Sequence, residues 1–284
     1  GVFLCAYVIF AVRLALSERV ISHDYLAEFN APALAVPVEE RGWTTLQSVQ
    51  IREMPDWTKP DGYLRHALQT LPNEQGWPLV VDFLNESSGE LDAIRHAAAA
   101  PQFGFVAETG PASRDGALSE ALVGVLLPHL GEIRRACTLL GLDSRRAVAD
   151  GDGDQFVLNA AALSSLARGA TEFPSLICGL VGISIDALLC RTIGEALRDS
   201  PEIFSDANLR DLAHLLDASG PSELMANSLR GERAFYTDTL QRLYTDDGHG
   251  DGLLDAAAMS ELSMLVNESA AGRPGTGVLT ALGP

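Results

Sequence analysis

Lysine is almost absent from this chain, and positive charge as a whole is scarce. A single lysine, Lys59, is found among 20 basic residues, against 38 aspartates and glutamates, and the formal net charge is −18. Nucleic-acid binding requires clustered cations that neutralise phosphates, so the composition argues against a nucleic-acid partner. The excess of carboxylates is compatible with cation binding or with a merely solvated surface.

The spacings that mark common catalytic and cofactor sites are also missing. No Cys-x-x-Cys pair occurs among the four cysteines, and none of the six histidines belongs to a His-Glu-x-x-His motif. There is no Gly-x-Ser-x-Gly elbow, phosphate loop or dinucleotide fingerprint. The sequence therefore indicates no catalytic residue and no organic cofactor, and the cysteines are expected to be buried as small apolar side chains.

Two polar features in apolar surroundings have no partner at a readable spacing. Asp186 is expected either to pair with an arginine such as Arg168 or Arg191, or to face a polar gap. His129 and Glu132 are three residues apart on one helical face and are expected to make a surface or capping contact. Neither feature is assigned to catalysis.

A strand-like alternation of apolar and polar residues is not sustained anywhere, so the chain is predicted to be all-α, with about ten helices. The longest apolar stretch, Phe173–Leu197, is predicted to be the central helix, because a helix that is apolar nearly all round is wrapped by other helices or by lipid. The antiparallel helical hairpins around it resemble a solenoid of the tetratricopeptide type. That repeat's signature residues do not recur here at a fixed period of about 34 residues, so the resemblance is architectural.

Composition and periodicity divide the chain into successive segments. Residues 1–17 are predicted to be the end of a transmembrane anchor. The remaining segments are 18–37, a connector; 38–100, an N-terminal helical subdomain; 101–117, a loop; 118–269, a helical-repeat core whose first helix is expected at Leu118–Leu127; and 270–284, a flexible tail.

The first twelve residues are uninterrupted apolar sequence, followed by Arg13. A membrane-spanning helix needs about 20 residues, so we expect the end of a transmembrane helix that starts before Gly1, with Arg13 reaching the interface. A buried N-terminal helix and the core of a signal peptide are the alternatives.

One loop has the spacing of a cation site. In the frame of an EF-hand, Asp247 occupies the first position, Gly252 the sixth and Ala258 the twelfth. Ca²⁺ takes oxygen ligands at alternating positions of such a loop, with a glycine at the sixth and a backbone carbonyl at the seventh. The predicted metal ligands are Asp247, His249, Asp251, Leu253 and Asp255.

Two departures weaken this EF-hand-like pattern. His249 replaces the usual aspartate or asparagine, and Ala258 replaces the bidentate glutamate, although Glu261 lies one turn further. The competing interpretation is a Gly/Asp-rich turn whose aspartates cap the next helix. Both interpretations stay open, and any Ca²⁺ binding is expected to be weak. Residues 150–154 (DGDGD) raise the same question and are expected to form a capped turn.

Three stretches carry a resemblance to a bacterial protein group, namely DYLAEFNAPALAVPVEERGW, LLPHLGEIRRACTLLGLDSRRAVADGD and GERAFYTDTLQRLYTDDGHGDG. They are similar to uncharacterised proteins, common in planctomycete-like genomes, with an N-terminal membrane helix followed by an α-helical domain. The resemblance covers most of the chain. It implies a cytoplasmic N-terminus and a periplasmic main domain, whereas Arg13 and Arg19 favour the opposite orientation. It implies no activity.

The sequence thus favours a membrane-anchored helical scaffold or interaction protein over an enzyme. Its expected partners are the inner membrane, through the N-terminal helix, and a protein. One alternative is an enzyme whose acidic groups converge only in three dimensions. Another is a subunit of a larger membrane complex.

Overall fold

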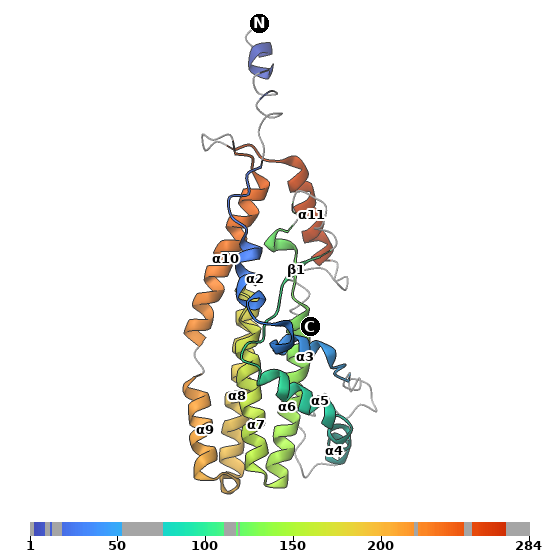
Figure 1. Cartoon of the computed structure of the whole chain (residues 1–284), viewed down its shortest axis with the longest axis vertical. Coiled ribbons are helices and arrows are strands. Elements are labelled where there is room, and N and C mark those ends of the chain that lie inside the picture. The colour runs from blue at the N-terminus through green and yellow to red at the C-terminus, as the bar shows by residue number, and fades with distance from the viewer. Residues whose placement is uncertain are drawn as a thin grey trace. The chain divides into compact units, whose positions relative to one another are not determined.

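The computed structural model describes residues 3–8, 12, 19–52, 76–110, 118, 120–218, 221–246 and 252–270. Helices predominate in this part of the chain (Figure 1). After a short helix at residues 3–8, the elements are α2 (Tyr25–Leu34), η1 (Val38–Glu40), α3 (Gly42–Ser48), α4 (Trp77–Glu86), α5 (Ser88–Ala98), β1 (Glu108–Thr109), η3 (Leu122–Gly124), β2 (Val125–Leu126), α6 (Pro128–Asp150), α7 (Gly153–Ala170), α8 (Leu176–Asp199), η4 (Pro201–Ile203), α9 (Asp206–Asp217), α10 (Pro221–Leu243) and α11 (Ala256–Ala270). The prediction of a mainly helical protein is confirmed.

The chain forms two compact units, each assembled from segments that are distant in the sequence. Unit 1 contains Gly1–Ala31, Ala107–Leu127 and Arg230–Pro284, and unit 2 contains Pro32–Val106 and Pro128–Leu229. The segments proposed from the sequence are each continuous, whereas both units combine stretches that are far apart in the chain.

Unit 2 is built on antiparallel helices joined by short turns. Helices α6, α7 and α8 pack against one another, and α9 packs on α7 (Figure 1). Asp152 caps α7 by accepting from the Gln155 amide at 2.9 Å, and Ser175 caps α8 by accepting from the Cys178 amide at 3.2 Å. These packed helix pairs agree with the predicted hairpins.

The centre of unit 2 is α7 rather than α8, which corrects the prediction for Phe173–Leu197. Helix α7 packs against α5, α6, α8 and α9. Its small residues allow this close approach. Helix α8 buries one row of side chains at a spacing of four residues, namely Ile177, Val181, Ile185, Leu189 and Ile193. Among the described residues, α8 is the one helix long and apolar enough to cross a membrane, and 44% of its most apolar window is buried.

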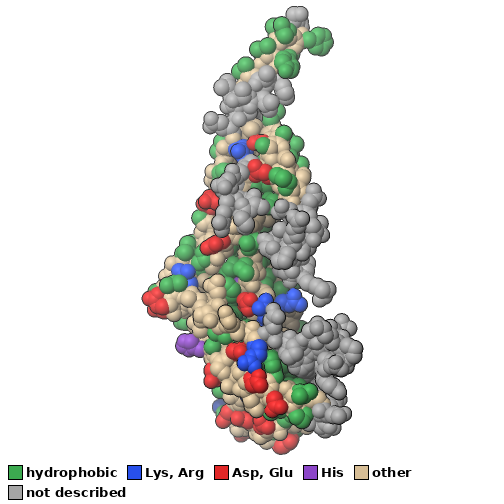
Figure 2. Space-filling model, turned by 90° about the vertical axis from the view of Figure 1, so that its right-hand side faces the viewer, with side chains coloured by type: hydrophobic (Ala, Val, Ile, Leu, Met, Phe, Trp, Pro, Cys, Tyr) green, Lys and Arg blue, Asp and Glu red, His purple; other side chains and the backbone are tan. Residues whose placement is uncertain are grey.

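Acidic side chains gather at the end of unit 2 where the α6–α7 and α8–α9 turns lie, at the bottom of Figure 2. Asp152 is the N-cap of α7, and Asp154 accepts from the Asn208 side chain at 2.8 Å. Asp206 lies in the first turn of α9. Carboxylates at helix N-termini interact favourably with the helix dipole. These contacts are those of the capped turn expected at residues 150–154.

Unit 1 contains α10 from Arg230 onward, α11 and the short sheet. Residues 118–127, predicted to be a helix, instead form η3 and β2, and β2 pairs antiparallel with β1. The reason is tertiary: the Leu118 amide donates to Glu261 of α11 at 2.9 Å, and the Leu122 amide donates to Asp238 of α10 at 2.7 Å. Carboxylates from distant helices thus satisfy amides that a local helix would otherwise pair.

Candidate functional site

The predicted cation loop is only partly described. Asp247, His249 and Asp251 lie outside the described residues. The Leu253 carbonyl, which an EF-hand would offer to the ion, accepts from the Thr245 amide at 2.9 Å. In return, the Leu253 amide donates to Thr245 Oγ1 at 3.0 Å. Thr245 and Leu253 are therefore hydrogen bonded to each other across the base of the loop.

Asp255 and Gly252 also have local roles. Asp255 Oδ1 caps α11 by accepting from the Ala257 amide at 2.8 Å and the Ala258 amide at 3.2 Å. Gly252 is required because a Cβ there would lie 2.0 Å from the Thr245 carbonyl oxygen. These contacts suit the capped-turn interpretation. Within the described part of the chain, no group of three or more His, Cys, Asp or Glu side chains could hold a metal ion. The Ca²⁺ site stays a prediction.

The segment that follows the apolar N-terminus is fixed to this same end of unit 1. Ser22 Oγ donates to Gln241 Oε1 at 3.1 Å, and Gln241 Nε2 donates to the His23 carbonyl at 2.7 Å. Arg19 Nε lies 3.2 Å from Asp255 Oδ2. The chain therefore enters unit 1 beside the connection between α10 and α11.

Four exposed apolar side chains belong to these same segments, and we call them the α10–α11 patch. They are Val20, Ile21, Tyr244 and Leu254, between 43% and 50% exposed. Tyr244 and Leu254 are joined by an isolated antiparallel bridge across the base of the loop. Val20 and Ile21 directly follow Arg19, whose partner Asp255 is the neighbour of Leu254. These four exposed apolar side chains therefore belong to the part of unit 1 where residues 19–23 meet the connection between α10 and α11.

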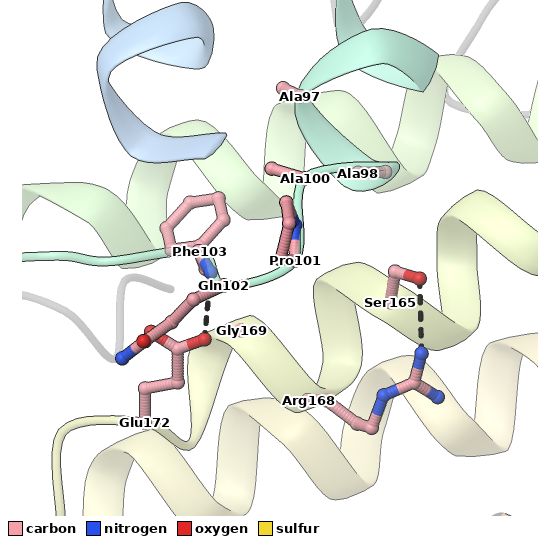
Figure 3. Close-up of a pocket in the computed structure, with 10 residues that line it drawn as sticks. All are labelled: Ala97, Ala98, Ala100, Pro101, Gln102, Phe103, Ser165, Arg168, Gly169 and Glu172. Atoms are coloured by element: carbon pink, nitrogen blue, oxygen red, sulfur yellow. Dashed lines mark hydrogen bonds between the residues drawn. The ribbon is translucent and has the colours of Figure 1, made fainter. Parts of the chain in front are cut away.

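A small cavity lies in unit 2, between residues 97–103 and the last turn of α7 (Figure 3). Its volume is ≈ 70 Å³, and its polar side chains are Gln102, Ser165, Arg168 and Glu172. Water occupies about 30 Å³ per molecule in the liquid, whereas pockets for organic ligands measure about 300–1,000 Å³. The cavity suits a few waters or a small ion rather than an organic substrate.

The carboxylate in this cavity has a structural task. Glu172 Oε1 accepts from the Phe103 amide at 2.8 Å, and Oε2 accepts from the Gly104 amide at 2.7 Å (Figure 3 draws the first of these). Burial raises the pKa of Glu172, while the two amides and the Gln102 side chain act to lower it. Gly104 has a φ of 69°, a left-handed conformation that favours glycine. Glu172 therefore clamps a turn with both of its oxygens.

The cation in the cavity is Arg168, which donates to Ser164 Oγ at 2.8 Å and to Ser165 Oγ at 3.1 Å. Burial raises the pKa of Asp186 on α8, and the charge of Arg168 opposes that shift. Of the two arginines expected as partners of Asp186, Arg168 is therefore the one that acts on it.

His129 is buried, so the expected surface or capping contact is wrong. Its ring stacks on Phe105 at a centroid distance of 3.7 Å, and Trp43 lies edge-on at 6.2 Å. His129 Nε2 is 4.0 Å from Cys178 Sγ, and Nδ1 has no hydrogen-bond partner. Burial lowers the pKa of His129 to about 3. A thiol at a helix N-terminus beside an imidazole can be reactive, but here both groups are buried and the ring stays neutral.

This buried imidazole predicts a pH-dependent stability. The unfolded chain binds a proton at His129 below about pH 6.5, whereas the folded chain does not until about pH 3. The free energy of unfolding is therefore expected to decrease as the pH falls from about 6.5 towards 3. From pH 6.5 to 4.5, His129 alone should remove about 2–3 kcal/mol from the free energy of unfolding. Urea unfolding of the wild-type and His129→Leu chains measures the difference.

The matched control is His214→Leu, because His214 is exposed on α9. That variant should keep the wild-type slope of stability against pH, and His129→Leu should flatten it. Equal slopes for all three chains would contradict a buried neutral histidine.

Among the described residues of unit 2, Asp143 on α6 is the carboxylate with no exposed surface. It pairs with Arg95 of α5 and with Arg146, whose Nη2 lies 2.5 Å from Oδ1. Asn159 of α7 donates to Asp143 Oδ2 at 2.8 Å, and Arg146 donates to Asn85 of α4 at 3.1 Å. One carboxylate thus connects four helices.

Sequence reasoning missed this network, although its members stand at helical spacings. Asp143 and Arg146 are three residues apart, as a surface ion pair would be. The burial comes from α5 and α7, which the local pattern does not reveal. The cysteines outside the predicted anchor were expected to be buried, which is confirmed for Cys137 and Cys178 and wrong for Cys190. Cys5 lies in the predicted anchor and is exposed in the structure.

Comparisons with protein-family models, with curated proteins and with solved structures find no significant match.

Proposed function

We propose that this chain is a membrane-anchored helical scaffold that presents its helical units to a protein partner. The observation that carries the proposal is the helix at residues 3–8, whose apolar side chains are exposed around it. Phe3 is 93% exposed, and Leu4 and Tyr7 are 68% and 69% exposed. Apolar area left in water is unfavourable by about 25 cal/mol per Å², so such a helix favours a bilayer.

The scaffold part of the proposal rests on how unit 2 is built. Its antiparallel helices are joined by capped turns, and Asp143 connects α4, α5, α6 and α7. A solenoid-like arrangement of these helices is part of the proposal. The one cavity described above is too small for an organic substrate, and its carboxylate is engaged by backbone amides. An enzyme with an acidic site therefore has less support than a binding surface. A subunit of a larger membrane complex is the other alternative, and the exposed part of α8 would then face lipid or a partner.

The resemblance to bacterial proteins with an N-terminal membrane helix supports placement at the inner membrane, with the helical units in the periplasm. Extracellular and periplasmic compartments supply Ca²⁺ at concentrations that weak sites require. This placement would agree with a structural Ca²⁺ site at the α10–α11 loop.

Anchoring is tested by flotation with phosphatidylcholine vesicles. The full chain is expected to float with the vesicles and to stay with them after an alkaline carbonate wash. A chain that begins at Arg19 should remain in the aqueous fraction after the wash, because it lacks the apolar segment. The retained fraction is measured by quantitative gel densitometry.

A matched control replaces Phe3, Leu4 and Tyr7 by serine in the full chain, which keeps its length. This variant should also leave the vesicles in carbonate. A full chain that stays in the aqueous fraction, or a shortened chain that floats equally well, would overturn the anchor.

The Ca²⁺ site is tested by unfolding with and without 10 mM Ca²⁺. A site with a Kd of about 10⁻⁴–10⁻³ M should raise the free energy of unfolding by about 1.4–2.7 kcal/mol. Asp251→Ala should abolish the increase, and Asp217→Ala, at the end of α9, should not. An increase of equal size in all three chains would indicate non-specific cation binding, and no increase would leave a capped turn.

A further inference from the structure

We propose that unit 1 rests in the headgroup region of the bilayer through the α10–α11 patch, Val20, Ile21, Tyr244 and Leu254. This inference rests on the proposed membrane anchor at residues 1–17 and adds a second membrane contact. It assigns an occupant, the lipid headgroup layer, to an apolar surface that is exposed in the structure.

The covalent chain places the patch near the membrane. Leu16 closes the apolar segment, and Arg19 is already paired with Asp255 at the base of the α10–α11 loop. Three residues span at most about 10 Å, even when fully extended. The headgroup layer is about 5–8 Å thick on each side of the hydrocarbon core. Once residues 1–17 are in the bilayer, Arg19 is therefore kept within about 10 Å of Leu16, and the patch beside it is kept close to the headgroups.

Several contacts, rather than a single one, fix residues 19–23 to the α10 and α11 end of unit 1. Ser22 and His23 are hydrogen bonded to Gln241 in the last turns of α10, and Arg19 is paired with Asp255 before α11. Unit 1 therefore cannot swing freely about residue 19 without breaking contacts on two helices. The end of the hairpin that carries Tyr244 and Leu254 is the end that stays near the anchor.

The chemistry of the patch suits the interface. Tyrosine is enriched at membrane–water boundaries, where its ring lies among apolar groups and its hydroxyl stays hydrated. Val20, Ile21 and Leu254 supply aliphatic area beside it. The loop between the two helices is acidic, with Asp246, Asp247 and Asp251 in the sequence, so anionic lipids should repel it. Zwitterionic phosphatidylcholine is accordingly the lipid expected to accept the patch.

The experiment measures the depth of single labelled positions in the vesicle-bound full chain. A background with Cys5→Ala, which keeps the anchor apolar, and Cys190→Ser removes the exposed thiols, while Cys137 and Cys178 are buried. Burial also raises the pKa of Cys137 and so suppresses its reaction. Leu254→Cys carries a nitrobenzoxadiazole label. Met264→Cys, exposed on α11 and about 12 Å along that helix from its first residue, Ala256, is the matched control.

With phosphatidylcholine vesicles, the label at position 254 should shift to the blue and be quenched by headgroup nitroxide lipids. The label at position 264 should keep its aqueous emission and be quenched by iodide. Replacing Val20 and Ile21 by serine should reduce the shift at position 254 while flotation persists. Vesicle binding with an aqueous spectrum at position 254 would overturn this inference and leave the anchor intact.

Two other outcomes are distinguishable. A chain that does not float would refute the anchor, and this inference would fail with it. A blue shift at position 254 that appears without vesicles and grows with protein concentration would place a second copy on the patch, which also overturns the lipid assignment.

Discussion

Replacing Asp143 by alanine is expected to lower the free energy of unfolding of unit 2 by about 3–5 kcal/mol. Removing one partner from a buried ionic network leaves the others as uncompensated polar groups, and losses of that size are typical. Asp143 is 0% exposed, and its two arginine partners are also largely shielded. The measurement is equilibrium unfolding in urea, with hydrogen exchange to confirm that α6 and α7 are the helices that lose protection.

The control uses the same arginine. Asp92 also accepts from Arg95, at 2.8 Å, but its side chain is 79% exposed. Exposed ion pairs contribute about 0–1 kcal/mol, so Asp92→Ala should change the free energy of unfolding by less than about 1 kcal/mol. Similar losses for the two variants would mean that Asp143 is not the buried centre of the network. A second comparison, Asp143→Asn, keeps the volume and should recover only part of the loss.

Local signals in the sequence were sufficient for helices α6, α7 and α9 of unit 2. Pro128 opens α6, Asp152 caps α7, and Ser205 caps α9 with a capping box completed by Asn208. Each signal acts within one turn of its own helix, so it can be read without knowing the fold. The pattern of apolar residues also predicts helices over Pro221–Tyr244 and Leu254–Asn267, close to the observed bounds of α10 and α11.

Residues 118–127 illustrate what local signals cannot supply. The stretch is apolar and was expected to continue as a helix, but its amides are paired with Glu261 and Asp238, more than a hundred residues away. His129 was misplaced for the same reason, because Phe105 and Trp43 reach it from other segments. Which helix lies at the centre also depends on packing: apolar content favoured α8, whereas small residues in α7 let four neighbours approach.

Asp238→Ala is the second substitution with a large expected effect, about 3–5 kcal/mol in the free energy of unfolding of unit 1. Asp238 is buried on α10 and accepts from the Leu122 amide at 2.7 Å, from Arg242 Nε at 3.0 Å and from Gln241 Nε2 at 2.9 Å. Gln241 Nε2 in turn donates to the His23 carbonyl. One carboxylate therefore supports both the 118–127 segment and the segment that leads to the membrane. Hydrogen exchange should increase around η3 and β2 and leave α6–α8 protected.

A double variant separates the ion pair from the backbone contact. If the Asp238–Arg242 pair supplied all of the stability, Asp238→Leu combined with Arg242→Met would restore it, because apolar pairs can replace buried ion pairs at little cost. The Leu122 amide would still lack its acceptor, and the Glu120 carbonyl would lose the Arg242 Nη2 donor that lies 3.1 Å from it. A lost buried hydrogen bond of this kind costs about 1–3 kcal/mol. The double variant should therefore stay below wild type by that smaller amount. Thr237→Ala, which removes a local hydrogen bond to the Arg233 carbonyl, should have little effect. Full recovery in the double variant would show that the 118–127 segment does not depend on Asp238 for its position.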